Sequence, residues 1–339
     1  MLEKNLPFLL SPSYKGYLWG GSKLRDEYGK ESDLDTFAES WECSTHKDGQ
    51  SVVASGVYRG IRLGDVLSLH PEFLGSHPLK IMVGEDKPLN YDGLPILIKL
   101  IDAKSDLSIQ VHPTDEYAYE HEGGQLGKTE MWYVLHADRG ARIVYGLRKN
   151  LSLDEMKTAL SNGSVSKYLQ YVPVKKDDVF FVEAGTIHAI GEGAVIAEIQ
   201  ENSNLTYRLY DYDRTDKNGK TRELHIDKAL DVANLESSME PRQPMRVLMY
   251  RNGYGTEFLG RCKYFQVERM ILNTERYKEM ADYKTGSNSF KVLLCTDGCG
   301  TLFGNRVMLN FFKGDTIFVP ANSIPLKLHG RAQLLDISC

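Results

Sequence analysis

The sequence lacks any run of lysine and arginine, and its acidic residues outnumber its basic ones. There are 41 Lys and Arg against 46 Asp and Glu, which gives a formal net charge of −5. Binding to a nucleic-acid backbone needs a concentrated positive field, so we expect no nucleic-acid partner. An anionic ligand would instead have to be attracted by a small local group of charges.

Long hydrophobic runs are missing too. The apolar stretch near the start covers only residues 6–10, and no small-residue cleavage pattern follows it. No stretch elsewhere reaches the roughly 18 apolar residues that a membrane-spanning helix needs. We therefore expect a cytoplasmic protein that has no membrane partner.

Cysteine is scarce and scattered. The five cysteines are odd in number, and none forms a C-x-x-C pair, which fits a reducing cytoplasm. Cys295 and Cys299 are close in the sequence. A single C-x3-C pair without partner ligands, however, does not specify a metal or redox site.

Nucleotide-binding motifs of the G-x-G-x-x-G and P-loop types are also absent. What the sequence does contain is a series of short β-branched and aromatic runs separated by glycine, a pattern typical of β-barrels and sandwiches. With 42% hydrophobic and 26% charged residues, the composition is that of a globular protein. The strand candidates that cluster most closely are residues 95–101, 108–112, 130–135, 179–182, 195–200 and 206–212.

Two helical segments interrupt this β pattern. Ser152 and Glu155 form an S-x-x-E capping box at the start of the first, near residues 152–170. The second covers residues 224–235. We expect both to be insertions in a mainly β protein.

The length suggests a division of the chain into two parts. A chain of 339 residues suits about two domains of roughly 100 to 200 residues each. Pro241 and Pro244 indicate a linker, and strand signals resume beyond it. We therefore predict one domain over residues 1–240 and a smaller all-β domain over residues 245–339.

Four residues of the first domain predict a metal site. Gln110 and His112 are separated by one residue in a strand candidate, so both side chains project from one face. Glu130 opens another strand candidate, and His188 follows a glycine turn. This donor set suits Zn²⁺, and also Fe²⁺, Mn²⁺ or Co²⁺. A single strand histidine is more often a core residue, but these four follow one another in the order in which a cupin barrel presents its ligands.

Six sequence segments carry a resemblance to a known family. They are YLWGG at 17–21, AESWECS at 38–44, LIKLIDAKSDLSIQVHP at 97–113, GKTEMWYV at 127–134, GTIHAI at 185–190 and ENSNLTYRLYDYDR at 201–214. In this order they resemble type I mannose-6-phosphate isomerases, also called phosphomannose isomerases, of the cupin superfamily. The chain is similar to the shorter bacterial branch of that family.

The resemblance implies a fold and an activity. The expected fold is mainly β, with two cupin (jelly-roll) barrels and a helical insertion. The expected activity is the interconversion of mannose 6-phosphate and fructose 6-phosphate, with one Zn²⁺ per chain in the first barrel. No ligand set is repeated in the second barrel, where His329 stands alone, so we expect no metal there.

The resemblance also implies roles for individual residues. The family's zinc ligands fall on Gln110, His112, Glu130 and His188, and its catalytic arginine falls on Arg208. Its substrate positions fall on Trp19, Glu39, Lys99, Ser108, Lys128 and Glu198. These assignments are expectations about a phosphorylated sugar as substrate, and they predict no oligomeric state.

Three of these positions carry positive charge, and each has a second interpretation. Arg208 either stabilises an anion or forms a structural pair with Glu198 or Asp211. Lys99, in an apolar strand, either extends to the end of the barrel or meets an anion. Lys128 either points to the same face as Glu130, two residues on, or is a solvated loop residue.

The proton carrier and the reaction class also have alternatives. Glu198, which we expect desolvation to make more basic, and Lys128 are both candidates for moving a proton between sugar carbons. Two histidines and a carboxylate would also suit an iron-dependent oxygenase. A sugar-binding regulator that has kept the barrel is the third possibility.

Overall fold

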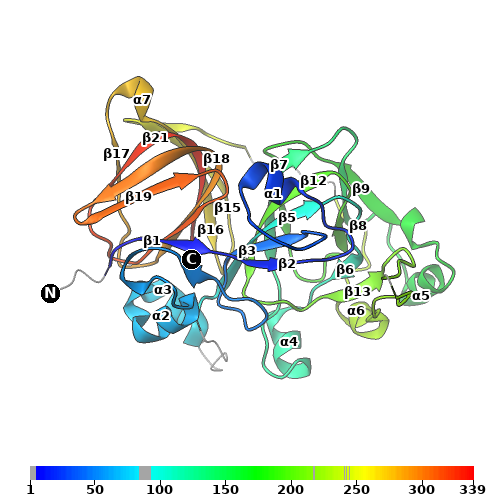
Figure 1. Ribbon diagram of the computed structural model, residues 1–339. Coiled ribbons are helices and arrows are strands. Elements are labelled where there is room, and N and C mark those ends of the chain that lie inside the picture. Colours follow the sequence, from blue (N-terminus) through cyan, green and yellow to red (C-terminus); the bar gives the residue numbers. More distant parts are fainter. Residues whose placement is uncertain (1–4, 84–92, 217, 240, 242, 244) are drawn as a thin grey trace.

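The computed structural model describes residues 5–83, 93–216, 218–239, 241, 243 and 245–339. The fold is mainly β, as predicted, and its strands form three sheets of ten, six and five strands. Figure 1 shows the C-terminal strands on one side of the molecule and the strands of the middle of the chain on the other. Among the described residues, no helix is long and apolar enough to cross a membrane.

The six-stranded sheet is the middle layer of the molecule. Its order is β10-β7-β12-β5-β3-β2, and all neighbours are antiparallel. Every residue of β5 and β12 is buried, because one face packs against the C-terminal sheet and the other lines a barrel interior. The strands are β2 Ser13–Lys15, β3 Glu39–Cys43, β5 Ile96–Ala103, β7 Glu130–Ala137, β10 Val179–Val182 and β12 Ala194–Glu201.

The five-stranded sheet lies opposite this middle layer. Its order is β13-β6-β11-β8-β9. One face joins the six-stranded sheet in an apolar cluster that includes Trp132, Ile143 and Ile196. The other face is covered by helices that contribute Met156 and Leu230. The strands are β6 Ile109–Val111, β8 Arg142–Leu147, β9 Leu169–Pro173, β11 His188–Ile190 and β13 Tyr207–Tyr210.

The ten-stranded sheet contains the C-terminal third of the chain together with two strands from its beginning. Its main path is β14-β15-β16-β21-β18-β20-β1-β4, with β17 on β21 and β19 on β18. Its strands are β1 Phe8–Ser11, β4 Val52–Val53, β14 Met249–Arg251, β15 Tyr254–Arg261, β16 Gln266–Asn273, β17 Ala281–Tyr283, β18 Lys291–Gly304, β19 Val307–Phe312, β20 Thr316–Val319 and β21 Leu326–Ser338.

The participation of β1 and β4 bears on the predicted domains. Both strands precede residue 240 in the sequence and yet pair within the sheet of the C-terminal residues. The division near residues 240–245 stays a prediction. Part of the linker prediction, Arg242 and Pro244, lies outside the described residues.

The helices are short, and α5 and α6 pack on the face of the five-stranded sheet. The capping box of α5 is confirmed: Ser152 accepts from the Glu155 amide, and Glu155 accepts from the Ser152 amide. The helices are α1 Lys23–Tyr28, α2 Leu63–Leu69, α3 Ser76–Val83, α4 Asp115–His121, α5 Leu153–Ser161, α6 Ile226–Val232 and α7 Thr274–Tyr277, with 3₁₀ turns at Gly56–Tyr58, Pro71–Phe73 and Val165–Lys167.

All six strand candidates between residues 95 and 212 are confirmed as strands, although the last is shorter than predicted. We expected it to reach Tyr212, but β13 ends at Tyr210. Tyr212 and Asp213 have φ values of 57° and 52°, in the left-handed region that ends a strand. Tyr212 therefore does not share a strand face with Arg208.

Candidate metal and substrate site

The five-stranded sheet places three polar side chains in one row. In the strand register, Gln110 of β6 pairs with His188 of β11 on one side and with Arg208 of β13 on the other. Residues opposite one another on neighbouring antiparallel strands project to the same face. A ligand bound near Gln110 would therefore lie close to both His188 and Arg208.

Two histidines and a carboxylate converge in the barrel interior. The ligand atoms of His112, Glu130 and His188 all lie within 4.8 Å of one another, and all three residues are buried. The two Nε2 atoms are 3.1 Å apart. Glu130 lies 3.6 Å from His112 Nε2 and 3.4 Å from His188 Nε2. Within the described part of the chain no other group of His, Cys, Asp or Glu side chains has this arrangement.

The hydrogen bonds of the two imidazoles show what this site requires. His112 Nδ1 lies 2.8 Å from the Leu205 carbonyl, and His188 Nδ1 lies 2.8 Å from the Thr186 carbonyl. A carbonyl only accepts, so Nδ1 carries the proton and each Nε2 of a neutral ring is an unprotonated acceptor. Burial lowers the pKa of His188 to about 4 and holds that of His112 well below its usual value.

The two Nε2 acceptors lie only 3.1 Å apart, which favours a cation beside them, and Lys128 Nζ lies 3.2 Å from that of His112. Glu130 Oε1 is also buried and has no hydrogen-bond donor among the described residues. The neutral tautomers and the orphaned carboxylate oxygen are the features of a divalent metal site. The residues present therefore fit a metal ion.

Gln110 lies at the edge of this cluster. Its Nε2 is 3.4 Å from His188 Nε2. The oxygen and nitrogen of an amide have nearly the same shape, so a half-turn of the side chain would bring Oε1 to the same place. All four predicted ligands thus come together in the structure.

The six-stranded sheet contributes charges that alternate in sign. Across its strands, Lys99 pairs with Trp41 on one side and with Glu198 on the other. Lys99 Nζ lies 3.9 Å from Glu39 and 3.6 Å from Glu198. It also lies 4.9 Å from the centroid of the Trp41 ring, a cation–π distance.

Lys128 continues this alternation towards the metal cluster. Its Nζ lies 3.2 Å from Glu198 and forms an ion pair with Glu130. Lys99 and Lys128 are each only 4% exposed. Lys99 therefore meets anions instead of extending to solvent, and Lys128 is not a solvated loop residue.

The environment of Glu198 differs from our expectation. We expected desolvation to make this carboxylate more basic. Burial does act in that direction, but the nearby Lys128 and Lys99 ammonium groups outweigh it and lower the pKa of Glu198. Glu130, buried more completely, has its pKa raised to about 7 in spite of Lys128.

Guanidinium groups occupy the other end of the site. Arg208 donates from Nε to Ser108 Oγ at 3.3 Å and from a terminal nitrogen to the Glu223 carbonyl at 2.7 Å. Asp211 forms ion pairs with Arg214 and Arg222. No carboxylate among the described residues is within ion-pair distance of Arg208, so the alternative of a structural pair with Glu198 or Asp211 is wrong.

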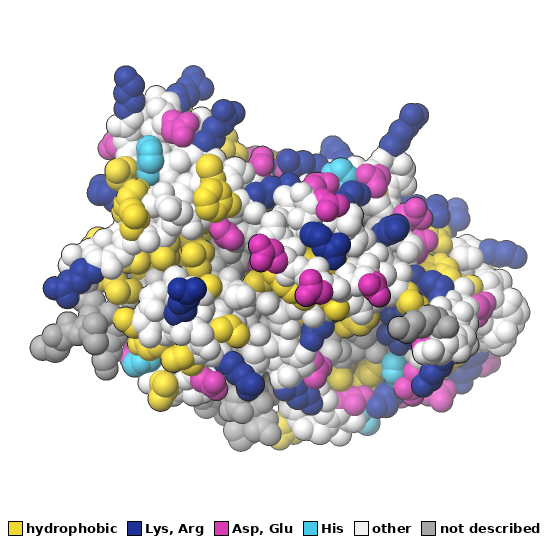
Figure 2. Space-filling model, in the orientation of Figure 1, with side chains coloured by type: hydrophobic (Ala, Val, Ile, Leu, Met, Phe, Trp, Pro, Cys, Tyr) yellow, Lys and Arg dark blue, Asp and Glu magenta, His cyan; other side chains and the backbone are white. Residues whose placement is uncertain are grey.

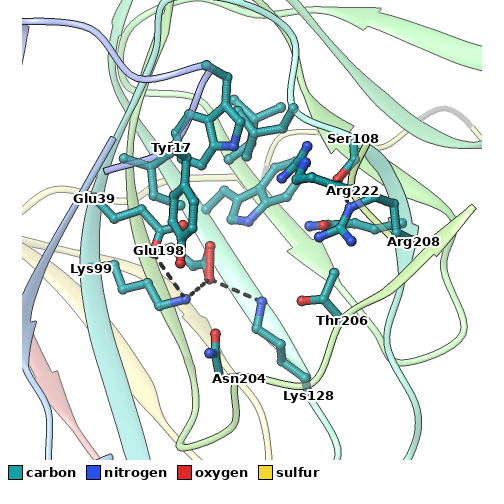
Figure 3. A pocket seen from close by; sticks show the side chains of 16 residues that line it. Tyr17, Glu39, Lys99, Ser108, Lys128, Glu198, Asn204, Thr206, Arg208 and Arg222 are labelled. Atoms are coloured by element: carbon teal, nitrogen blue, oxygen red, sulfur yellow. Dashed lines mark hydrogen bonds and ion pairs between the residues drawn. The ribbon is translucent and has the colours of Figure 1, made fainter. Parts of the chain in front are cut away.

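These side chains line one pocket of about 220 Å³ (Figure 3). Figure 3 shows Lys99, Glu39 and Glu198 towards one end, with Arg208, Arg222 and Ser108 towards the other. Every predicted catalytic and substrate residue lines this pocket, as does Gln110. The complete set of predicted residues in the lining is Trp19, Glu39, Lys99, Ser108, Gln110, Lys128, Glu198 and Arg208.

Other lining residues were not predicted. Tyr17, whose ring stacks on Trp19 with centroids 5.4 Å apart, and Asn204 and Thr206 all lie inside segments quoted above. Arg222 belongs to the polar stretch after β13, which has no periodicity, so no sequence signal pointed to it. Trp132 also lines the pocket, and its buried Nε1 has no acceptor among the described residues.

Sequence comparison connects this site with one family. The family model for the catalytic domain of type I phosphomannose isomerase matches residues 8–128. The mannose-6-phosphate isomerase ManA of Bacillus subtilis is 36% identical over 332 residues, which cover 97% of this chain and 98% of ManA. The probable mannose-6-phosphate isomerase GmuF of the same organism is 40% identical over 330 residues, with the same coverage.

Comparison with solved structures points to the same family. The crystal structure of the mannose 6-phosphate isomerase from Bacillus subtilis superimposes with a TM-score of 0.86 at 34% identity, covering 98% of this chain and 99% of that chain. A mannose 6-phosphate isomerase bound with zinc and yttrium superimposes at 0.71 with 16% identity, covering 98% of each chain, which shows the shared fold. The predicted cupin architecture is thereby confirmed.

Proposed function

The chain belongs to the type I phosphomannose isomerase family, and we propose that it interconverts mannose 6-phosphate and fructose 6-phosphate in the pocket between Arg208 and Lys128. One observation of the structure carries this proposal most directly. Two unprotonated imidazole nitrogens and an orphaned carboxylate oxygen meet beside a pocket with cationic side chains at both ends. An aldose–ketose isomerase of sugar phosphates needs both elements: an electrophile for the carbonyl and cations for the phosphate.

We infer that one zinc ion per chain is held by Gln110, His112, Glu130 and His188. Zinc accepts this set of nitrogen and oxygen donors. When bound, such an ion polarises a carbonyl oxygen and stabilises negative charge that develops on it. The histidines are prepared for this role, because the Leu205 and Thr186 carbonyls fix their tautomers without any rearrangement.

The charge distribution suggests how the substrate is oriented. Arg208 and Arg222 lie at the same end of the pocket, and each guanidinium offers a planar pair of donors to a phosphate. Burial and the neighbouring Arg222 lower the pKa of Arg208, so an anion at this end would relieve the repulsion between the two cations. The phosphate would then lie here, and C1 and C2 would face Glu198 and Lys128.

Glu198 and Lys128 are the residues we assign to proton transfer. They form one buried ion pair with atoms 3.2 Å apart, so one partner can accept a proton while the other supplies one. The two ammonium groups that surround Glu198 keep it ionised, which a general base requires. Lys99 holds Glu198 from the opposite side at 3.6 Å and limits the positions it can take.

Arg208 has a second role in this proposal. It pairs in register with Gln110, next to the metal cluster, and its Nε contacts Ser108. A guanidinium at this place can stabilise the negative charge that grows as the enediolate forms. The remaining substrate positions, Trp19 and Glu39, line the wall of the same pocket.

The proposal is tested by turnover of fructose 6-phosphate in a coupled assay after chelation and again after metal is added back. Loss of activity on chelation and recovery with zinc would support both parts of the proposal. Metal-independent turnover would contradict the metal assignment. Absence of turnover, with iron in the purified protein and oxygen consumption, would favour the oxygenase, and sugar-phosphate binding without any reaction would favour a regulator.

A further inference from the structure

The segment that carries Lys128 has no regular secondary structure. Residues 122–129 connect α4 to β7 without a helix or a strand. A side chain on such a segment is not placed by a ladder of backbone hydrogen bonds. Its position therefore depends on the individual contacts that hold the backbone on either side of it.

The Lys128 amide itself donates to the Pro113 carbonyl at 3.1 Å, and side-chain carboxylates hold the amides on both sides of it. The Gly127 amide donates to Asp115 Oδ1 at 3.0 Å, and the Thr129 amide donates to Glu201 Oε1 at 2.7 Å. A methyl group at position 127 would come within 2.5 Å of the Asp115 amide nitrogen, so the segment lies directly against the start of α4. Two carboxylates thus hold the residues immediately before and after Lys128.

These two carboxyl groups also interact with one another. Glu201 is 1% exposed, and its Oε2 has no hydrogen-bond partner among the described residues. A like charge nearby disfavours the ionised form of a carboxyl as deeply buried as Glu201. Burial and the Asp115 charge accordingly hold the pKa of Glu201 well above its usual value.

The C-terminal sheet completes this arrangement. Tyr264, in the turn between β15 and β16, donates from its hydroxyl to Asp115 Oδ2 at 2.5 Å. Lys263 Nζ lies 3.8 Å from the same oxygen. The hydroxyl of a residue far along the sequence thereby orients the carboxyl that holds Gly127.

We propose that Asp115, Glu201 and Tyr264 are positioning residues that fix the Gly127–Thr129 backbone and so keep the Lys128 ammonium within reach of Glu198. The proposal rests on the assignment of Lys128 to proton transfer. It gives the C-terminal sheet, which has no metal ligand among its described residues, a part in catalysis through Tyr264.

Three variants and one control test the proposal. Glu201→Gln keeps an acceptor for the Thr129 amide and a donor for Asp115, whereas Glu201→Leu removes both. Tyr264→Phe removes only the hydroxyl. Tyr283→Phe is the matched control, because Tyr283 donates to a buried carboxylate, Asp336, within the C-terminal sheet at 3.2 Å.

The measurements are hydrogen exchange of the Gly127 and Thr129 amides, kcat and KM on fructose 6-phosphate, metal content and melting temperature. We expect Tyr264→Phe and Glu201→Leu to speed exchange of these amides and to lower kcat about tenfold or more, as is usual when a residue that orients a functional group is lost, with KM within about twofold and metal retained. Glu201→Gln should stay close to the wild type in both readouts. Tyr283→Phe should change only the melting temperature.

Unchanged exchange at Gly127 in Tyr264→Phe, or equal damage from Glu201→Gln and Glu201→Leu, would overturn the proposal. So would a fall in melting temperature with kcat unaltered. If Glu201→Leu does not fold, Tyr264→Phe still decides the question. The exchange measurement needs no turnover, so an inactive wild-type protein would refute the proposed function without deciding this inference.

Discussion

The two regions of the molecule use the interiors of similar β-sheets in opposite ways. Between the six- and five-stranded sheets, the buried space contains Lys99, Lys128, Glu130 and Glu198. The interior formed by the C-terminal sheet is mainly apolar, with side chains such as Leu302, Phe311 and Leu328, and Asp336 is a buried carboxylate beside it.

The difference shows what the first region is built for. A buried charge without a partner costs several kcal/mol, and even a buried ion pair is commonly no more stable than hydrocarbon of the same volume. The C-terminal sheet shows that this chain can fill such an interior with hydrocarbon. The alternating charges of the first region are therefore explained by chemistry and not by stability.

The two regions differ in their buried charges but not in the charges on their surface. On the face seen in Figure 2, lysine and arginine side chains are interspersed with aspartate and glutamate. The positive charge that would attract a phosphate lies inside the pocket, as the acidic composition of the chain requires.

The largest expected effect compares two histidines of the first region with one of the C-terminal region. His188→Ala and His112→Ala should lose the bound metal, and turnover should fall by about 10³-fold or more, because a metal ion supplies several kcal/mol of transition-state stabilisation. His329→Ala, which removes a ring bonded to Thr274 in the C-terminal region, should leave metal content unchanged. Metal analysis and the coupled assay check both, and a metallated, active His188→Ala protein would contradict the assignment.

The next effect compares two arginines. Arg208→Ala should lower kcat by about 10²-fold with metal retained, the range for removing one donor that stabilises an oxyanion. Lysine at this position should restore only part of the rate, since a point charge cannot reproduce the planar group. Arg269→Ala, which breaks a pair with Glu257 in the C-terminal region and a pair with Asp177 of the first region, should lower the melting temperature and leave kcat near normal.

One result for Arg208→Ala would contradict its catalytic assignment. If Arg208→Ala kept a normal kcat while its melting temperature fell by several degrees, Arg208 would be structural. The thermal unfolding curve and the steady-state rates are both needed for that conclusion.

A smaller effect separates the two guanidinium groups within the first region. Arg222→Ala should raise KM about tenfold, the equivalent of one charge-assisted hydrogen bond, while kcat stays within a few-fold of normal. Arg208→Ala, which removes both proposed roles of Arg208, should lower kcat by a larger factor than it raises KM. A fall in kcat without any rise in KM for Arg222→Ala would show that Arg222 does not contact the phosphate in the ground state.

The smallest effect concerns Glu201, at the boundary between the two regions. Its pKa is raised in the folded protein, so the folded state binds the extra proton and its free energy of unfolding falls as pH rises above about 4.5. The slope is at most about 1.4 kcal/mol per pH unit for one proton. Glu201→Gln should remove this contribution, whereas burial raises the pKa of the nearby Cys262 thiol in both proteins.

Urea unfolding of Glu201→Gln and the wild type over a series of pH values measures the difference. As pH rises, the free energy of unfolding of Glu201→Gln should increase relative to that of the wild type. A constant difference would mean that Glu201 is not protonated in the folded state.

Much of the site could be predicted because its residues belong to strands. Gln110 lies in β6 and His112 directly follows it, and Glu198 lies in β12, so alternation along a strand predicts the direction of these side chains. The capping box of α5 is equally local, since Ser152 and Glu155 satisfy one another's amides.

What could not be predicted depends on contacts between distant segments. Arg222 reaches the pocket from irregular backbone through its pair with Asp211. The pKa of Glu198 is set by two lysines on other segments, and neither their distance nor their number is visible in the sequence around it. The left-handed conformation of Tyr212 is likewise unexpected for a residue with a bulky side chain.

The pairing of β1 with β20 has a consequence for synthesis of the chain. Phe8 is in register with Phe318, about 310 residues later. At the usual 5 to 20 residues per second, β1 would leave the ribosome about 15 to 60 s before its partner exists. During that interval an apolar strand such as Phe8–Ser11 has only β4 to pair with, and the sheet of the C-terminal residues closes when the last strands arrive. One of the first strands to be synthesised is therefore among the last to be fully paired.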